Sequence, residues 1–344
     1  MLYLWIFLLI LGLVLLVKGA DWFVGGSSGI AKKCKIPPLV IGLTVVAFGT
    51  SAPELAVSVT SAIKHSTDIA VGNVVGSNIA NIFLILGVSA LIKKLPVQKE
   101  SLKIDLPVLL GASALLIGLG GWGNSIQWWD GLILLLVFAL YMTLTLLKAR
   151  KEIRAEKLKI AEAKANGTYI AEETEEKKPP KTKVGAWFLR MQEKLWFCII
   201  LAIVGLAMVV GGGTLFVDGA KYIARAAGVS ERIIALTVVA IGTSLPELVT
   251  SVMAAMKGET DIAVGNIIGS NIFNVLLILG TSSLFYPLAF SIQANLVDAL
   301  VAFGGALLLF VLSFFDKHRL GIPAGIIFLL SFIGYYVYLF LIPA

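Results

Sequence analysis

The chain has 344 residues, of which 58% are hydrophobic and only 14% are charged, and its mean hydropathy is +0.94. This composition excludes an ordinary soluble globular domain and indicates a polytopic membrane protein. The two cysteines, Cys34 and Cys198, lie far apart without CxxC spacing, and the two histidines, His65 and His318, fall in expected loops. Neither a disulfide framework nor a zinc site is therefore indicated.

Apolar segments of membrane-spanning length recur ten times along the chain. A hydrocarbon core of about 30 Å needs about 20 apolar residues in a helix. We expect spans at roughly 2–28, 37–62, 71–92, 104–120, 130–147, 195–220, 232–256, 264–286, 294–315 and 322–342. The first segment lacks a basic region and a small-residue cleavage site, so we interpret it as a helix and not as a secretion signal.

The basic residues are distributed unequally between alternate loops. Of the 28 Lys and Arg residues, 23 fall on one side of the expected membrane and four on the other, and Lys18 lies within the first span. The positive-inside rule then places both termini outside and the central loop in the cytoplasm, in a plasma membrane. This arrangement accounts for the net charge of +7 without a nucleic-acid partner.

The only long polar segment divides the chain into two halves. Residues 148–194 carry mixed charges and few aromatic side chains, which is typical of a solvated linker. A lipid-binding or regulatory role is the alternative. We therefore expect an N-terminal half at 1–147, a cytoplasmic linker, and a C-terminal half at 195–344.

Each half contains one copy of an internal repeat, within about 37–92 and about 230–286. Residues 49–87 and 242–280 are identical at 26 of 39 positions, with a constant offset of 193. Five spans separate equivalent helices, and because five is odd, the copies must run in opposite directions. We expect an all-α membrane protein of ten transmembrane helices, arranged as two inverted five-helix repeats with broken helices at the midplane. Gly- and Pro-interrupted segments at equivalent positions are the sequence indication of a transporter binding site.

The first copy places oxygen atoms on one helix face around a carboxylate. Thr50, Ser51 and Glu54 are three or four residues apart. Pro53 has no N–H for the carbonyl four residues earlier, so backbone oxygen becomes free there. The second copy repeats the arrangement with Thr243, Ser244, Pro246 and Glu247.

The next span of each copy adds further polar side chains at helical spacing. These are Ser77 and Asn81 in the first copy and Ser270 and Asn274 in the second. Two bidentate carboxylates and two freed carbonyls would supply six oxygen ligands, and Ca²⁺ takes about six to eight. The two glutamates would also balance its charge. Asn81 and Asn274 either face an ion or form interhelical hydrogen bonds.

Several neighbouring motifs have structural interpretations. The two Gly-xxx-Gly spacings favour close helix packing, Thr67-Asp68 and Thr260-Asp261 favour N-caps, and Lys18 is the expected partner of Asp21. These residues and spacings are Gly72-xxx-Gly76, Gly265-xxx-Gly269, Thr67, Asp68, Thr260, Asp261, Lys18 and Asp21.

GTSxPE followed by GNxxGSNIxN, occurring twice, resembles the alpha-repeats of the cation/calcium exchanger superfamily. Within it the chain is similar to prokaryotic sodium/calcium exchangers. The resemblance implies an antiporter that extrudes Ca²⁺ against entering Na⁺ by alternating access, with the first and sixth helices sliding past a fixed core. It implies that Ca²⁺ binds Glu54, Glu247 and the carbonyls of Thr50 and Thr243. The implied Na⁺ ligands, besides the glutamates, are Ala47, Ser51, Ser77, Ala240, Ser244 and Ser270.

The chain differs from some relatives at one position. Potassium-dependent exchangers carry Asp where this chain has Asn274, which argues against K⁺ co-transport. Coupling to H⁺ or K⁺ remains the alternative to Na⁺, and a cation channel is a remote one. An enzyme is not indicated, because Ser51 and Ser244 have no His or Lys repeated beside them. No cofactor or protein partner is implied, and a monomer would suffice.

Overall fold

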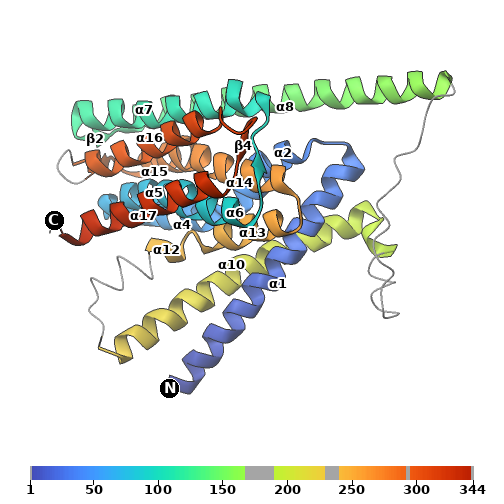
Figure 1. Ribbon diagram of the computed structural model, residues 1–344. Helices are drawn as coiled ribbons and strands as arrows, with labels where there is room; N and C mark the ends of the chain where they lie inside the picture. Colours follow the sequence, from blue (N-terminus) through green and yellow to red (C-terminus); the bar gives the residue numbers. More distant parts are fainter. Residues whose placement is uncertain (1, 167–189, 229–239, 292–294, 342–344) are drawn as a thin grey trace.

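The computed structural model describes residues 2–166, 190–228, 240–291 and 295–341 (Figure 1). Nearly all of the described chain is helical, and several helices contain π-helical turns, labelled η. The elements of the first half are α1 (Leu2–Cys34), α2 (Pro38–Ile41), η1 (Gly42–Val46), α3 (Ala47–Thr50), α4 (Ala52–Ile63), α5 (Thr67–Ile79), η2 (Ala80–Leu86), α6 (Gly87–Ile92), β1 (Leu95–Pro96), η3 (Ser101–Asp105), α7 (Leu106–Gly123), β2 (Ser125–Ile126) and α8 (Trp128–Ala165).

The second half repeats much of this order. Its described elements are α10 (Leu195–Ala226), α12 (Ala240–Gly242), α13 (Leu245–Met256), α14 (Thr260–Phe273), η5 (Asn274–Leu279), α15 (Gly280–Phe285), β3 (Leu288–Ala289), α16 (Asn295–Leu312), β4 (Arg319–Leu320) and α17 (Ile322–Leu341).

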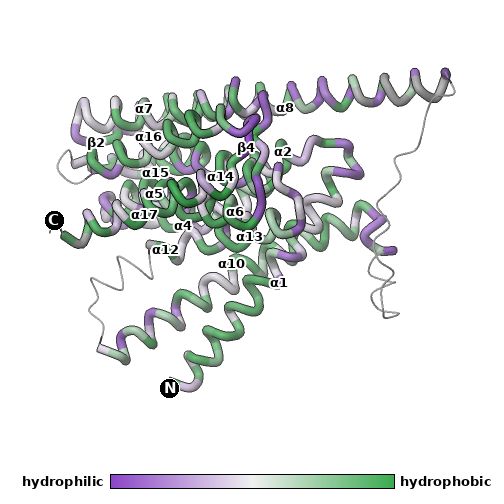
Figure 2. Tube along the Cα trace, viewed as in Figure 1, coloured by the Kyte–Doolittle hydropathy of each residue, from purple (hydrophilic) through white to green (hydrophobic). Residues whose placement is uncertain are grey.

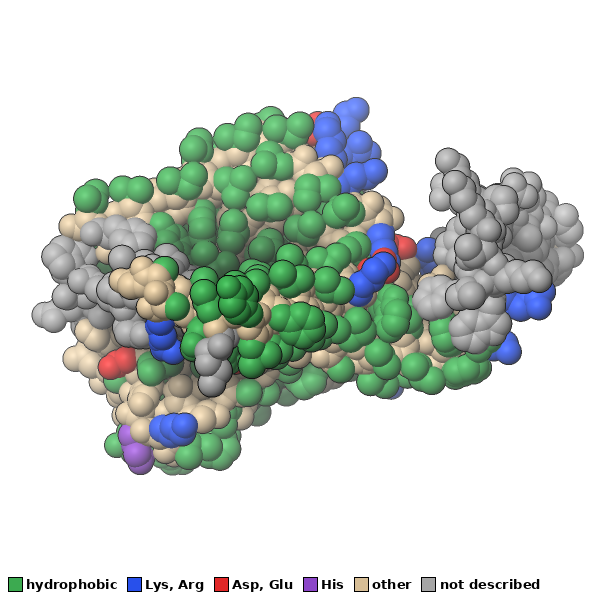
Figure 3. Space-filling model, turned by 90° about the horizontal axis from the view of Figure 1, so that it is seen from below, with side chains coloured by type: hydrophobic (Ala, Val, Ile, Leu, Met, Phe, Trp, Pro, Cys, Tyr) green, Lys and Arg blue, Asp and Glu red, His purple; other side chains and the backbone are tan. Residues whose placement is uncertain are grey.

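Within the described residues, eight helices are long and apolar enough to cross a membrane. A ninth span results if the bent pair Pro38–Thr50 and Ala52–Ile63, which meet at 46°, is counted as one. The expected span at 232–256 begins outside the described residues, and its second part is the shorter apolar helix α13. The chain is thus a multi-pass helical membrane protein. Figure 3 shows hydrophobic side chains covering much of one face, as contact with lipid requires.

Helix α8 continues to Ala165, through the first part of the segment 148–194 that is expected to be the linker. The run after the apolar stretch is rich in Lys, Arg, Glu and Ala, which have high helix propensity. Lys148 and Glu152 add an ion pair of 3.9 Å at (i, i+4) spacing. Figure 2 shows this extension as a hydrophilic segment projecting beyond the other helices.

Helices α1 and α10 pack along one another as a pair and cross the rest of the molecule obliquely (Figure 1). Glycines make this contact close: a Cβ at Gly26 would lie 2.5 Å from the Ala202 nitrogen, and one at Gly205 would lie 2.4 Å from the Phe23 nitrogen. Small residues at such interfaces allow backbones to approach. Leu16, Ala20 and Val209 form a small hydrophobic core of this pair, separate from the main core, with residues of α13 packed against it.

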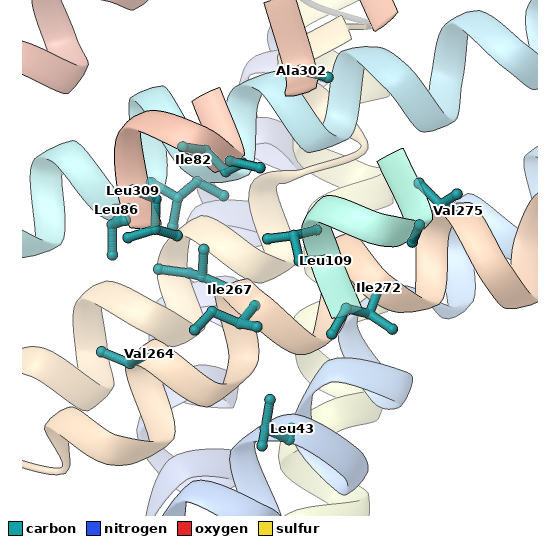
Figure 4. Packing of buried hydrophobic residues seen from close by; sticks show 14 of the residues in the cluster. Leu43, Ile82, Leu86, Leu109, Val264, Ile267, Ile272, Val275, Ala302 and Leu309 are labelled. Atoms are coloured by element: carbon teal, nitrogen blue, oxygen red, sulfur yellow. The ribbon is translucent and has the colours of Figure 1, made fainter. Parts of the chain in front are cut away.

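The two repeat segments form the centre of the main core. Figure 4 shows Leu43 of η1, Ile82 of η2, Ile267 of α14 and Leu109 of α7 among its side chains. In the segment from Thr67 to Ile92, 72% of the most apolar 18-residue stretch is buried. In the segment from Thr260 to Phe285, the buried share is 94%. Ser77, Asn81, Ser270 and Asn274 are therefore carried by the two most enclosed of the eight long helices of the described chain.

Two short antiparallel ladders tie the halves together. Leu95 of β1 pairs with Leu320 of β4, and Ser125 of β2 pairs with Ala289 of β3. Each ladder joins one strand of the first half to one of the second. They fix loops next to the ends of the central helices.

Candidate ion-binding site

Both glutamates of the repeat lie in the first turn of a helix that begins immediately after a break. Glu54 is in α4 and Glu247 is in α13, and each is 1% exposed. The break residues Ser51 (φ −84°, ψ 5°) and Ser244 (φ −88°, ψ 6°) have the same backbone conformation. The positive end of each helix dipole therefore favours the carboxylate that follows it.

The local sequence explains both breaks. In the first copy, the Ser51 N–H donates to the Ala47 carbonyl at 3.0 Å, and the Leu55 N–H donates to the Ser51 carbonyl at 3.1 Å. Between them Pro53 has no N–H to donate to the carbonyl of Gly49. In the second copy, the Leu248 N–H donates to the Ser244 carbonyl at 2.9 Å, and Pro246 takes the place of Pro53.

The two breaks meet at one place, so the carboxylates of the two copies face the same buried space. Ser51 of the first copy donates a hydrogen bond of 3.0 Å to Glu247 of the second. Glu54 lies close to Glu247 and to Ser77. Ser270 and Thr50 lie close to Glu247. Side chains from four helices, two from each copy, thus surround a pair of acids.

This space holds an excess of buried oxygen atoms without protein partners. The unpaired atoms among the expected site residues are both carboxylate oxygens of Glu54, Oε2 of Glu247, Oγ of Ser77, Ser244 and Ser270, and Oδ1 of Asn81 and Asn274. Burying an uncompensated carboxylate costs several kcal/mol. Two acids and several neutral oxygens form a donor set for a hard cation.

The donor set contains only two acids. No group of three or more His, Cys, Asp or Glu side chains able to hold a metal ion exists among the described residues. A divalent ion between Glu54 and Glu247 would therefore be neutralised by the glutamates alone. Its remaining ligands would have to be carbonyl, hydroxyl or amide oxygens.

The other expected ligands do not occupy equivalent positions in the two copies. Thr50 and Ala47 are fully buried, whereas Thr243 is half-buried. Ala240 is the first described residue after the gap and begins α12.

Asn274 shows one of the two expected roles, an interhelical hydrogen bond. It donates a 3.0 Å hydrogen bond from Nδ2 to Oδ1 of Asn78 in α5, while its own Oδ1 stays unpaired. Asn78 in turn donates to the Asn271 carbonyl at 3.3 Å. The amide nitrogen of Asn274 thus joins the two copies. Asn78 was not among the expected residues.

A polar pair that the sequence motifs did not predict occurs in both copies. Asn73 donates to Ser58 Oγ at 3.0 Å, and the equivalent Asn266 donates to Ser251 Oγ at 2.9 Å. Asn266 additionally accepts a 3.1 Å hydrogen bond from Thr50 of the other copy. The detectable signal was the recurrence of all four residues at the offset of 193.

Two structural interpretations of the sequence are wrong. Thr67 and Thr260 are the first helical residues and not N-caps, and neither α5 nor α14 has a side-chain capping bond. Thr67 instead accepts a hydrogen bond from the Ala289 N–H at 3.2 Å. Asp21 pairs with Lys257 at 2.6 Å, because α1 docks against the turn between α13 and α14.

The glycine interpretation is confirmed for one copy. A Cβ at Gly265 would lie 2.7 Å from the Leu39 carbonyl oxygen, and one at Gly269 would lie 2.8 Å from that of Leu43. The positions equivalent to Leu39 and Leu43, Arg232 and Leu236, lie outside the described residues, so the same packing at Gly72 and Gly76 stays a prediction.

Helical spans and two buried acids among unpaired oxygens define the class of secondary ion transporters. The chain belongs to the sodium/calcium exchanger family, because the family model described as "Sodium/calcium exchanger protein" matches residues 4–147 and 197–341. It is therefore an antiporter of that family and not an enzyme.

Full-length relatives agree with this assignment. The "Putative antiporter CaxA" of Alkalimonas amylolytica is 38% identical over 97% of this chain and 98% of the relative. The "Sodium/calcium exchanger MaX1" of Methanosarcina acetivorans is 34% identical over 97% of this chain and 98% of its own length. A solved structure of the sodium-calcium exchanger NCX_Mj, soaked with Na⁺ and Ca²⁺, superposes with a TM-score of 0.79 at 34% identity and covers 98% of this chain and 99% of that one.

Proposed function

We propose that the chain exchanges Na⁺ for Ca²⁺ by alternating access. The observation that carries the proposal is the buried pair Glu54 and Glu247 among oxygen atoms that have no protein partner. These two acids carry the charge that one Ca²⁺ or two Na⁺ would neutralise. Names of relatives that include sodium/calcium exchange support the same cargo.

The proposed site uses the expected residues in two groups. Ca²⁺ binds between the glutamates and the carbonyls freed at the breaks, at Thr50 and Thr243. Na⁺ ions use the same acids with the neutral oxygens around them: Ala47, Ser51, Ser77, Ala240, Ser244 and Ser270, with Asn81 and Asn274 nearby. The two ions compete for one set of acids, which couples their transport.

The proposed architecture has ten spans in two inverted halves, 1–147 and 195–344, joined by the segment 148–194. The antiparallel sense of the copies follows from an odd number of spans between them. The distribution of Lys and Arg supports external termini and a cytoplasmic linker in a plasma membrane.

Electrogenic extrusion of Ca²⁺ is part of the proposal. Two Na⁺ would balance one Ca²⁺, and a third Na⁺ among the hydroxyl oxygens would move one net charge per cycle. One charge is worth about 2.3 kcal/mol per 100 mV, which shifts the Ca²⁺ ratio at equilibrium by roughly fifty-fold.

Reconstituted protein tests these points in one preparation. ⁴⁵Ca²⁺ uptake is measured in proteoliposomes loaded in turn with Na⁺, K⁺ or acidic buffer, and only the Na⁺ gradient is expected to drive uptake. If a K⁺ gradient or acidic loading alone drove uptake, the coupling ion would be K⁺ or H⁺ and not Na⁺. The membrane potential is then clamped with an ionophore at a fixed Na⁺ gradient. If the Ca²⁺ distribution does not change with the membrane potential, the exchange is electroneutral.

A further inference from the structure

A groove of about 360 Å³ lies between α16 and α17, outside the ion-binding site. Each helix lines it with three residues at i, i+4 and i+7 spacing, which places their side chains on one helix face. The groove therefore follows the two helices for about two turns, or about 10 Å, and its volume is that of a small-ligand site. The lining residues of the two helices are Val297, Val301 and Gly304 of α16 and Ser331, Tyr335 and Tyr338 of α17.

The inner wall of the groove is Phe83 of η2, two residues after Asn81. Phe83 is 5% exposed, and a Cβ at Gly305 would lie 3.0 Å from its Cζ atom, so the ring is packed against α16. A molecule in the groove would thus touch the segment that carries Asn81.

A half-buried acid lies beside one end of the groove. Tyr335, which lines the groove, donates a 2.9 Å hydrogen bond to Asp298 Oδ1. Asp298 follows Val297 in the first turn of α16, so its carboxylate is close to the groove where that helix begins. Within the part of the chain that the structure describes, no Lys or Arg forms an ion pair with Asp298. An uncompensated carboxylate in a membrane-spanning helix is costly.

The first half contains the equivalent acid together with a cation. Asp105 and Asp298 are related by the offset of 193, and Tyr141 donates to Asp105 at 3.1 Å. Lys148 lies close to Asp105, and both residues line one small cavity. Helices α8 and α17 correspond at an offset of 194, as their first residues and the two bonded tyrosines show. The position equivalent to Lys148 is therefore Ile342, so the second half keeps the acid and the tyrosine but not the lysine.

We propose that a membrane lipid with a primary ammonium head group occupies this groove, with its ammonium group paired with Asp298 and an acyl chain against Phe83. The ammonium supplies the positive charge that Lys148 supplies in the first half. The two tyrosine hydroxyls suit the polar end of the lipid, since tyrosine favours the membrane interface, and Val301 and Phe83 suit the chain. In the proposed topology α16 begins at the external face, so the lipid belongs to the outer leaflet. The inference does not depend on which ions the chain exchanges.

The first test compares two lipids with identical acyl chains, phosphatidylethanolamine and phosphatidylcholine. Native mass spectrometry of the purified full chain in detergent measures the Kd of each lipid. Phosphatidylethanolamine should bind about tenfold more tightly, because a quaternary ammonium has no N–H to donate to the carboxylate. Asp298→Asn keeps an oxygen for Tyr335 and removes the charge, so both lipids should bind alike. Asp105→Asn, the equivalent substitution in the first half, should keep the tenfold preference.

The second test fills the groove. A Cβ at Gly304 meets no described atom within 4 Å, so Gly304→Leu has room for its side chain and should abolish binding of both lipids. Gly111→Leu is the matched control, because Gly111 is the equivalent exposed glycine of α7 and a Cβ there also meets open space. This variant should bind phosphatidylethanolamine as the wild type does. Ser331→Leu fills the groove from α17 and serves if Gly304→Leu does not fold.

Three results would overturn the proposal. Equal binding of the two lipids by the wild type, or a preference that persists in Asp298→Asn, would exclude the pairing with the ammonium group. Unchanged binding in Gly304→Leu and Ser331→Leu would exclude the groove as the site. A dimer in lipid-free detergent that Gly304→Leu converts to a monomer would assign the groove to a second copy of the chain. Because lipid binding is measured without ion flux, failure of the proposed exchange function would leave these results unchanged.

Discussion

The two copies of the repeat have nearly the same sequence around the acids but differ at their ends. In both, a serine precedes a break with almost the same φ and ψ, and a glutamate follows in the first turn. The turn before α14 is joined to α1 by ion pairs, whereas the turn before α5 carries different side chains. The shared residues would build the proposed site, whereas the turns distinguish its two ends.

The turns that precede α5 and α14 show that part of this difference is encoded in the sequence. Lys257 pairs with Asp21 at 2.6 Å, and Glu259 pairs with Lys32 at 3.3 Å and accepts a hydrogen bond from Ser28. All three partners lie on α1, so the turn between α13 and α14 is tied to the α1–α10 pair by charges of both signs.

The first copy cannot form the same contacts. Its turn carries Lys64 and Ser66 where the second has Lys257 and Glu259. The positions of α10 equivalent to Asp21 and Lys32 are Thr214 and Arg225. The equivalent acids are thus missing, and only one end of the molecule can be held in this way. The symmetry of the repeat is broken at its ends and kept at its centre.

The largest expected effect tests whether the two glutamates contribute equally to the proposed site. Glu54→Gln and Glu247→Gln should each abolish Ca²⁺ transport, because glutamine keeps the volume and removes half of the charge that neutralises the ion. ⁴⁵Ca²⁺ flux in proteoliposomes measures this, with folding checked by size-exclusion chromatography. Asp316→Asn is the matched control, because Asp316 is an exposed acid paired with Lys94 at 3.2 Å. Full flux in either glutamine variant would contradict the proposed site.

The sequence was sufficient for the features that depend on local pattern. Apolar length predicted the eight long helices and the bent pair, whereas the span expected at 232–256 begins outside the described residues. The 193-residue offset paired Glu54 with Glu247. Helical spacing placed Ser51 on the same face as Glu54, and in the structure Ser51 Oγ donates a hydrogen bond to Glu247 of the other copy.

Features that depend on contacts between distant elements could not be read in the same way. Asn73 and Ser58 are 15 residues apart on different helices, so no helical spacing connects them. Lys18 is three residues from Asp21, but the docking of α1 brings Lys257 to that acid instead. The capping interpretation failed for the same reason, since Thr67 bonds to the Ala289 N–H of a distant strand.

A smaller effect should show how closely α14 packs against the first broken helix. Gly265→Ala would place a Cβ 2.7 Å from the Leu39 carbonyl oxygen, so the broken helix would have to move. Overpacking of this kind costs about 1 to 3 kcal/mol. The thermal unfolding midpoint in detergent should fall for Gly265→Ala and stay near the wild-type value for Gly111→Ala, because Gly111 is an exposed residue of α7 at which a Cβ meets open space. An equal midpoint for both variants would contradict the close packing at Gly265.

The smallest effect concerns the ion pairs on α1. Lys257→Ala removes the contact with Asp21, whose side chain is 36% exposed, and exposed ion pairs contribute about 0.2 to 1 kcal/mol. The ratio of the KM values for Ca²⁺ at the two faces should therefore change by about 1.4- to fivefold. Lys64→Ala, the equivalent substitution in the first copy, should leave this ratio unchanged, since the α10 position equivalent to Asp21 is Thr214. Raising the ionic strength with choline chloride should move the wild-type ratio toward that of Lys257→Ala, because salt screens exposed charges. If both lysine substitutions changed the ratio of the KM values equally, the ion pairs on α1 would not account for a difference between the two ends.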